Sequence, residues 1–502
     1  MDIADFRTRI DEIDAKIVEL FSERMDACAE IAAYKKERGL PVRDAERERE
    51  KLTSVASRSP EAIREYSEAL YSLIMELSRR YQERLTGGAG LKCGLLGKTL
   101  AHSYSPAIHE MLGAYEYALY EKDEPEIEEF LKSGEWDGLN VTIPYKKTVF
   151  PFLDESSADA AKTGSVNTII RKPDGTLYGE NTDVYGFTAL FRHSGIRAEG
   201  KKALVLGSGG ASAAAVSALE ALGADAVVIS RTGDNNYGNL EKHRDAELII
   251  NATPVGMYPE NGVSPIDLRL FPECRGVLDA VYNPRKTALL LQAEKLGIPC
   301  AGGLYMLVAQ AKRASELFTG ISIPDGETDR IFREIAFSTQ NIVLIGMPGV
   351  GKSTVAAALG AITGRAVFDS DIEITRRTGF KPEEIIARDG ETAFRDAEER
   401  VIAELGKMSG AVIATGGGAV TRKKNYASLR QNGIMVRLCR DISSLPDGGR
   451  PLSRKYGVSE LYAEREALYR KFSDIAVDIG ADAEGSARKV LSAVSEKVRG
   501  GA

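Results

Sequence analysis

The feature that most constrains this chain is an apolar run that leads directly into a glycine-rich loop. The run Asn341-Ile342-Val343-Leu344-Ile345 precedes Gly346-Met347-Pro348-Gly349-Val350-Gly351-Lys352-Ser353-Thr354, which has the pattern GxxxxGK[ST]. This pattern predicts a strand, a loop and a helix, with backbone N–H groups wrapped around phosphate oxygens. Lys352 would reach the outer phosphates, and Ser353 would bind magnesium. We therefore expect a nucleotide site made by Gly349, Val350, Gly351, Lys352, Ser353 and Thr354.

A second glycine-rich turn lies in the middle of the chain, after the apolar run 203–206 and before an alanine-rich segment. A glycine pattern of this kind is a weak sign of a dinucleotide site when it stands alone. The next apolar run ends in Ile229-Ser230-Arg231-Thr232, where arginine and threonine suit the 2′-phosphate of NADP and NAD would favour an acidic residue. We therefore expect NADP to be bound by Gly207, Ser208, Gly209, Gly210, Ala211, Ser212, Arg231 and Thr232.

The pattern of apolar residues divides the chain into three parts. Residues 1 to about 85 space apolar side chains three and four apart, which predicts amphipathic helices, the second beginning near 42–44 and the third spanning about 59–85. From Leu91 onward, short apolar runs alternate with helical segments, which is typical of parallel α/β domains. The predicted strands are 93–96, 139–142, 203–206, 226–229, 248–250 and 341–345, and a helix is expected near 329–335.

These patterns predict a multidomain fold of three parts. An all-α helical domain covers residues 1–88. An α/β region covers 89–338, with a substrate lobe at about 91–190 plus C-terminal helices and a Rossmann-type NADP lobe at about 191–300. An α/β domain with the phosphate loop covers 339–502. A length of 502 residues fits about three domains.

Composition narrows the class of protein. The formal charge is -7, which disfavours non-specific binding of nucleic acid. Five scattered cysteines without a CxxC pair and four histidines argue against disulfide scaffolding and a zinc site. The acidic start of the chain does not have the pattern of a signal peptide, and no stretch has the length and hydropathy of a membrane span. We expect a cytoplasmic protein.

Residues after the phosphate loop indicate an anionic acceptor. Asp369 and Asp371 stand two apart at an apparent strand end, so we expect them to share one face of the strand, where one suits magnesium and the other a substrate hydroxyl. Arg395, Arg450 and Arg465 suit an anion and a charge-rich transition state. A single arginine is more often part of a surface ion pair, so the set is informative only together with the loop.

This series, with Thr415-Gly416-Gly417-Gly418, resembles shikimate kinase over residues 340–482. The resemblance implies that ATP and Mg²⁺ are used and that Lys352 and Asp371 are catalytic, with Asp371 holding the attacking hydroxyl. It further implies that Asp369 supports the metal and that Arg450 lies on a closing lid over the phosphates. The carboxylate side of shikimate would then be bound by Arg395, Gly417 and Arg465.

The middle region contains hydroxyls and amides with one lysine and one aspartate that could transfer protons beside a hydride, Lys146 and Asp183. In isolation, Lys146 could equally be a solvated surface lysine. Together the segments resemble shikimate dehydrogenase over residues 92–336, which implies that Lys146 and Asp183 are the catalytic pair. It also implies a cofactor contact at Gly303 and a substrate site of Ser103, Ser105, Thr142, Asn167, Tyr282 and Gln310. Catabolic use of quinate is the alternative for this region.

Polar residues of the helical region fall on shared helix faces: Arg24 with Lys35, Asp44 with Glu48, and Ser78 with Gln82. The string 41–49 with these pairs resembles the all-helical chorismate mutase. That resemblance implies an intertwined homodimer, a ring-hydroxyl site at Asp44 and Glu48, and Lys35 and Gln82 at the ether oxygen. The carboxylates would be held by Arg7, Arg24, Arg47 and Ser78.

The leading hypothesis is a trifunctional enzyme of aromatic amino-acid biosynthesis that uses NADP, ATP and Mg²⁺. The middle region would reduce 3-dehydroshikimate to shikimate, the C-terminal region would phosphorylate shikimate, and the N-terminal region would convert chorismate to prephenate. The alternative is a bifunctional dehydrogenase and kinase in which the helical region is a dimerising sensor of chorismate or prephenate.

Overall fold

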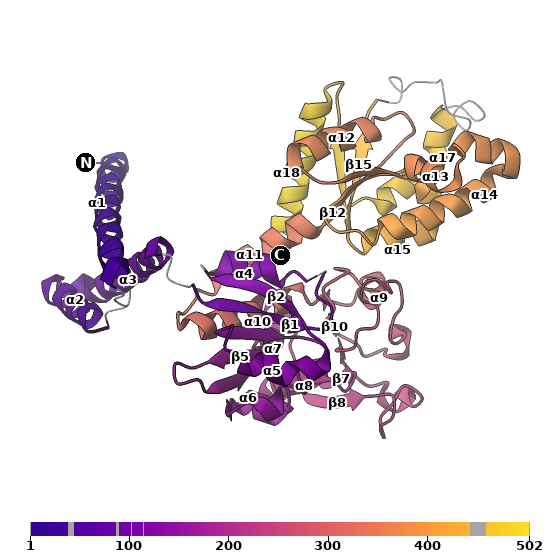
Figure 1. Cartoon of the computed structure of the whole chain (residues 1–502). Coiled ribbons are helices and arrows are strands. Elements are labelled where there is room, and N and C mark those ends of the chain that lie inside the picture. Colours follow the sequence, from indigo (N-terminus) through magenta and orange to yellow (C-terminus); the bar gives the residue numbers. More distant parts are fainter. Residues whose placement is uncertain are drawn as a thin grey trace. The chain divides into compact units, whose positions relative to one another are not determined.

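The computed structural model describes residues 2–38, 45–86, 90–101, 103–113, 115–441 and 458–500. The predicted fold class is confirmed, because a helical region is followed by a two-lobed α/β region and then by an α/β region with the phosphate loop (Figure 1). All five cysteines carry free thiols. In the part of the chain that is described, no helix combines the length and the hydropathy of a membrane span.

The helical region consists of α1 (Ile3–Arg38), α2 (Ala45–Arg58) and α3 (Arg64–Thr86), and α3 packs against both other helices. The third helix begins later than expected, because a 3-10 turn at Glu61–Ile63 follows Pro60. The predicted start of the second helix at 42–44 lies outside the described residues. Much of the apolar stripe of α1 remains exposed in this single chain.

The first lobe of the middle region is built on a six-stranded sheet of order β2-β1-β3-β5-β6-β4. Buried side chains of this lobe include the only tryptophan, Trp136, between α5 and β3. Its strands are β1 (Lys92–Gly97), β2 (Glu116–Glu121), β3 (Gly138–Val141), β4 (Glu155–Ser156), β5 (Thr168–Arg171) and β6 (Leu177–Glu180). Its helices are α4 (Ser105–Leu112), α5 (Ile127–Lys132), α6 (Ala158–Thr163) and α7 (Thr182–Ser194).

The second lobe has a fully parallel sheet of order β11-β10-β9-β7-β8, as a Rossmann-type lobe requires. Helix α7 packs against α8 and α10, so it joins the two lobes (Figure 1). The strands are β7 (Lys202–Leu206), β8 (Asp225–Ile229), β9 (Leu248–Asn251), β10 (Gly276–Asp279) and β11 (Cys300–Ala301). Its helices are α8 (Gly210–Ala221) and α9 (Ala288–Leu296), whereas α10 (Leu304–Thr319) and α11 (Gly326–Thr339) pack against α4 of the first lobe.

The C-terminal region is a parallel sheet of order β13-β14-β12-β15-β16, and helices α12 and α18 pack against each other (Figure 1). The phosphate loop leaves the central strand β12. The strands are β12 (Asn341–Ile345), β13 (Val367–Asp369), β14 (Val412–Ala414), β15 (Gly433–Cys439) and β16 (Ile475–Asp478). The helices are α12 (Lys352–Thr363), α13 (Ser370–Thr378), α14 (Pro382–Leu405), α15 (Lys423–Arg430), α17 (Val458–Phe472) and α18 (Ala483–Gly500).

Candidate active sites

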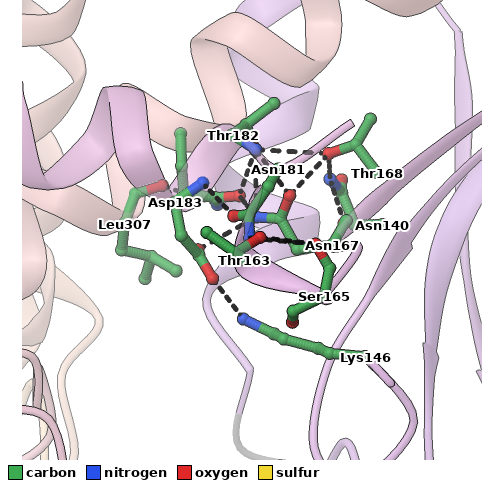
Figure 2. Close-up of polar contacts among 11 residues, drawn as sticks. Asn140, Lys146, Thr163, Ser165, Asn167, Thr168, Asn181, Thr182, Asp183 and Leu307 are labelled. Carbon is green, nitrogen blue, oxygen red and sulfur yellow. Dashed lines mark hydrogen bonds and ion pairs between the residues drawn. The ribbon is translucent and has the colours of Figure 1, made fainter. Parts of the chain in front are cut away.

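Lys146 and Asp183 form the centre of the site in the middle region. Lys146 lies in the turns after β3, and Asp183 lies in the first turn of α7. Lys146 Nζ is 2.6 Å from Asp183 Oδ2, and the Asp183 side chain is only 6% exposed (Figure 2). A Cβ atom on Gly210 would lie 3.6 Å from Lys146 Cδ, so the pair adjoins the first turn of α8. A charge-assisted hydrogen bond of this length is typical of a preformed ion pair.

An amide network fixes the second oxygen of Asp183. Asn167 Nδ2 donates to Asp183 Oδ1 at 2.9 Å, and Asn167 Oδ1 accepts from the Thr182 backbone N–H at 2.7 Å (Figure 2). Gln310 Oε1 lies 3.4 Å from Asn167 Nδ2. Asn181 caps α7 by accepting from the Asp183 N–H at 3.2 Å. The structure therefore brings together the predicted residues Lys146, Asn167, Asp183 and Gln310, and adds Asn181 and Thr182.

The other predicted substrate residues lie at ends of elements in the same region. Ser105 begins α4, and its N–H donates to Ser103 Oγ at 3.2 Å. Thr142 directly follows β3, and its N–H donates to Leu96 O at 2.9 Å. The Tyr282 ring lies 5.2 Å from that of Tyr104. Burial, and then the neighbouring Tyr104, raise the pKa of Tyr282 to about 12, so its hydroxyl stays protonated.

The glycine-rich turn between β7 and α8 has the geometry of a phosphate site. Gly207 has φ +110°, a conformation that favours glycine, and Ser212 Oγ donates to its carbonyl oxygen at 2.7 Å. The turn residues 208–212 therefore lead into the N-terminus of α8, where backbone N–H groups attract anions. Arg231 and Thr232 are exposed after β8. Gly303 is required because a Cβ atom there would overlap Ala280 O.

A buried carboxylate, Asp279, supports the loop beside this turn. It accepts from Asn251 Nδ2 at 2.9 Å and from Thr287 Oγ1 at 2.6 Å. Asn251 Oδ1 in turn accepts from Thr253 Oγ1 at 2.6 Å, and the Thr253 methyl group faces Gly207. Burial raises the pKa of Asp279 to about 6, against the lowering effect of its hydrogen bonds. Asp279 was not among the predicted residues, because nothing in its sequence neighbourhood marks it as buried.

In the C-terminal region, the lysine of the phosphate loop donates hydrogen bonds to carbonyl groups of the loop itself. Lys352 is buried, and Nζ donates to Gly346 O at 2.8 Å and Met347 O at 2.9 Å. Gly349 and Gly351 have φ of +83° and +108°. The loop residues 349–354 therefore present the N-terminus of α12, with Lys352 at its first position, as an anion site.

Two carboxylates lie at the junction of β13 and α13, but they are not arranged as predicted. We expected Asp369 and Asp371 on one face of a strand; instead the strand ends at Asp369, which caps α13 by accepting from the Asp371 N–H at 2.9 Å. The prediction of a shared strand face was wrong because an aspartate before Ser-Asp also fits a helix cap. Ser353 Oγ donates to Asp369 Oδ2 at 2.6 Å.

The residues predicted for the acceptor carboxylate surround the loop 415–418. Arg395 is buried and pairs with Glu398 at 2.6 Å, while Arg465 Nη1 donates to Gly417 O at 3.4 Å. A Cβ atom on Gly416 would lie 2.7 Å from Glu398 Oε1 and 2.9 Å from Asp371 Oδ1. The structure thus brings the loop together with Arg395, Arg465 and Asp371. Arg450 lies outside the described residues.

Glu398 is a residue that the sequence analysis missed. Burial raises its pKa, as does the nearby Asp371 charge, whereas Arg395 and Arg465 oppose the rise. Glu398 Oε1 and Arg465 Nε have no hydrogen-bond partner in the part of the chain that the structure describes. Unpaired polar atoms inside a charged cluster are costly without a ligand. The helical spacing of Arg395 and Glu398, three apart, was the available signal.

The helical region brings together only part of its predicted set. Arg24 Nη1 donates to Ser78 Oγ across α1 and α3, and Glu48 pairs with Arg79 at 3.4 Å. Lys35 and Gln82 are half-buried, whereas Arg7 and Arg47 are exposed. Asp44 lies outside the described residues.

Comparison with protein families matches each of the three parts. A chorismate mutase type II model matches residues 6–83, a shikimate dehydrogenase substrate-binding domain model matches 95–169, and a shikimate kinase model matches 348–495. The three resemblances drawn from the sequence are therefore confirmed.

Two curated relatives are named shikimate dehydrogenase (NADP(+)). One, from Clostridium perfringens (strain SM101), is 36% identical over 264 residues, which are 48% of this chain and 97% of the relative. The other, from Caldanaerobacter subterraneus subsp. tengcongensis, is 36% identical over 258 residues, which are 45% of this chain and 91% of the relative. A solved chorismate mutase/shikimate 5-dehydrogenase fusion protein from Clostridium acetobutylicum is 35% identical and covers 49% of this chain and 97% of its own, with a TM-score of 0.47. Since nearly the whole length of these curated relatives is matched, this chain belongs to the shikimate dehydrogenase family, and the regions on its two sides match the chorismate mutase type II and shikimate kinase models.

Proposed function

We propose that the chain is a trifunctional enzyme of aromatic amino-acid biosynthesis. It reduces 3-dehydroshikimate to shikimate with NADPH, phosphorylates shikimate to shikimate 3-phosphate with ATP, and rearranges chorismate to prephenate. The three family matches and the names of the relatives support this assignment. The observation that carries it is the partly buried Lys146–Asp183 pair beside the glycine-rich turn.

In the reduction, a proton must reach the carbonyl oxygen that becomes the new hydroxyl. Lys146 donates this proton, and Asp183 orients the ammonium group and stabilises its charge. Asn167 holds Asp183 in place by donating to its second oxygen. When bound, NADPH supplies the hydride. The substrate's hydroxyl and carboxylate groups are bound by Ser103, Ser105, Thr142, Asn167, Tyr282 and Gln310.

NADP is preferred over NAD because Arg231 and Thr232 follow β8 at the position where a 2′-phosphate would lie. The turn 207–212 and the N-terminus of α8 would hold the pyrophosphate. Gly303 allows close approach of the backbone near the nicotinamide.

In the kinase reaction, Asp371 accepts the proton of the attacking hydroxyl of shikimate. Lys352 leaves its two loop carbonyls and binds the outer phosphates, while ATP supplies the phosphoryl group. Arg395, Arg465 and Gly417 bind the acceptor's carboxylate, and Arg450, which lies outside the described residues, has the role of excluding water from the phosphates. Ser353 Oγ and Asp369 Oδ2, 2.6 Å apart, are oxygen ligands of the kind that Mg²⁺ prefers, and they would hold it beside the nucleotide phosphates.

The mutase reaction needs positioning of a dianion and stabilisation of charge on the ether oxygen. Arg24 and Ser78 already share a hydrogen bond, and they bind a carboxylate together with Arg7 and Arg47. Lys35 and Gln82 stabilise the ether oxygen. Asp44 and Glu48 bind the ring hydroxyl.

The chain forms a homodimer through its helical region. Apolar side chains along one stripe of α1 are 46% to 70% exposed: Ile3, Ile10, Ile13, Ile17 and Leu20. A stripe of this length on a helix is normally covered, and the same stripe of a second copy is the matching surface. Analytical ultracentrifugation of Ile13→Glu should show a shift from dimer to monomer. An unchanged mass would contradict this interface.

We further propose domains at 1–88, 89–338 and 339–502 and a cytoplasmic location. Helix α11 ends at Thr339 and β12 begins at Asn341, which agrees with the second boundary to within two residues.

Steady-state assays of the full chain test the three activities. We expect NADPH oxidation with 3-dehydroshikimate, ADP formation with shikimate, and loss of chorismate absorbance. To separate a catalytic helical region from a sensor, chorismate turnover is compared with that of Arg24→Ala, and prephenate is added to the other two assays. Loss of turnover in the variant with no effect of prephenate supports catalysis; no turnover by the wild type together with a prephenate effect supports the sensor.

A further inference from the structure

Tyr469 is a buried tyrosine of α17 that the proposed kinase mechanism does not use. Its side chain is 1% exposed, and its hydroxyl donates to the carbonyl oxygen of Gly417 at 2.5 Å. Burial is the main reason that the pKa of Tyr469 is raised to about 12, so the hydroxyl remains a donor at any working pH. Any buried hydroxyl needs a hydrogen-bond partner, so the presence of a partner is not informative by itself. The informative point is that the partner is Gly417 O.

Gly417 O receives two donors from one face of α17. Arg465 and Tyr469 are four residues apart, about one helical turn, and Arg465 Nη1 lies 3.4 Å from the same oxygen. Two donors on one carbonyl fix the orientation of the peptide between Gly417 and Gly418. In a trans peptide the C=O and N–H bonds point in opposite directions. The Gly418 N–H is therefore turned away from α17.

The loop around this peptide is tightly enclosed on its other sides. A Cβ atom on Gly417 would lie 2.6 Å from Pro348 Cγ in the phosphate loop, and one on Gly418 would overlap the Arg395 guanidinium. The N–H groups of Gly417 and Gly418 have no hydrogen-bond partner within the described ranges. Two unpaired backbone donors between two buried arginines form an anion site.

We infer that Tyr469 is a positioning residue of the kinase site, which holds the Gly417–Gly418 peptide so that the Gly418 N–H faces the acceptor's carboxylate. This inference rests on the proposed phosphorylation of shikimate. The tyrosine does not touch the acceptor itself. Its hydroxyl acts through the loop, and its effect depends on the negative charge of the acceptor.

The test is Tyr469→Phe in the full chain, which removes the hydroxyl and keeps the ring. Kinase activity is followed as ADP formation in the absence of NADP(H). We expect the KM for shikimate to rise about tenfold, the range of one lost hydrogen bond, with kcat and the KM for ATP within about twofold. The matched control is Tyr426→Phe, whose ring packs on Phe472 with centroids 5.0 Å apart and which should leave all three constants unchanged.

A second substrate separates positioning from a structural role. The methyl ester of shikimate lacks the carboxylate charge, so Tyr469→Phe and the wild type should differ about twofold or less in KM for the ester. An equal loss with ester and acid, a parallel rise in the KM for ATP, or no change in the KM for shikimate would overturn the inference. Absence of ADP formation by the wild type would instead contradict the proposed kinase function on which the inference depends.

Discussion

The dehydrogenase site and the helical region differ in what one copy of the chain supplies. In the dehydrogenase site, Lys146, Asn167 and Asp183 are held by one another, all from a single chain. In the helical region, Arg24 meets Ser78, but Arg7 is exposed and the apolar stripe of α1 lies open. We infer from this difference that the proposed dehydrogenase site is complete in one copy and propose that the mutase site needs a second.

The largest expected effect comes from a substitution in the dehydrogenase site. Lys146→Met should lower kcat for reduction of 3-dehydroshikimate roughly 10³-fold, because the proton donor is lost. The measurement is the initial rate of NADPH oxidation. Lys132→Met is the matched control, since Lys132 is an exposed helix lysine that pairs with Glu128 at 2.6 Å. A loss of less than about tenfold in Lys146→Met would remove Lys146 from the catalytic role.

Mixing inactive subunits sharpens the comparison. Arg7→Ala and Arg24→Ala should each reduce chorismate turnover about 100-fold, since each loses a carboxylate contact. If Arg7 serves the partner's site, unfolding and refolding the two variants together restores about a quarter of the wild-type activity, because half of the dimers regain one intact site of two.

The dehydrogenase should behave in the opposite way. Lys146→Met mixed with Asp183→Asn should regain no reductase activity above that of the separate variants, because both residues belong to one copy. Recovery of reductase activity in this mixture, or no recovery of chorismate turnover in the mutase mixture, would contradict the proposed difference between the two regions.

A smaller effect concerns the cofactor. Arg231→Ser should raise the KM for NADPH about tenfold and leave the KM for NADH unchanged, because only NADPH carries the 2′-phosphate. Reductase kinetics with both cofactors give the ratio. Arg269→Ser, an exposed arginine paired with Asp267, serves as the control. Equal changes in the KM for NADPH and the KM for NADH would show that Arg231 does not bind the 2′-phosphate.

The last prediction concerns stability rather than activity. The pKa of Asp279 is raised to about 6 from an ordinary value of 3.8, so its contribution to stability is present below pH 4 and lost as the pH rises through 6. Over that window the loss amounts to about 3 kcal/mol. Relative to wild type, Asp279→Asn should therefore gain stability between pH 4 and 7.

Calorimetry of the full chain checks this, in the thermal transition that NADP⁺ shifts upward. Asp225→Asn, an exposed position on β8, is the control. A Tm difference between Asp279→Asn and wild type that stays constant with pH would contradict the assignment.

Local patterns were enough to predict much of the fold. The runs 203–206 and 341–345 became β7 and β12, and each leads into its glycine-rich loop as expected, because a strand, a tight turn and a helix are encoded by neighbouring residues. Lys146 and Asp183 are 37 residues apart in the sequence, so no local pattern predicts that they meet. Their pairing was predicted from the family resemblance.

Other features depend on packing that no local pattern contains. Asp371 lies in a helix, because Asp369 accepts a hydrogen bond from its N–H and caps that helix. The same residues also fit the alternating pattern of a strand. Glu398 and Asp279 are charged residues in buried positions, which ordinary patterning assigns to the surface. In the sequence, Tyr469 resembles an ordinary core aromatic residue. Only the structure shows that its hydroxyl donates to Gly417 O.

Trp136 has a practical consequence. It is the chain's only tryptophan, and it is buried in the dehydrogenase's first lobe. Fluorescence excited at the red edge of the protein spectrum therefore comes from one place in a chain for which three activities are proposed. The emission of the intact protein reports when that lobe opens or loses its packing, and it does so without a label and without interference from the mutase or kinase regions.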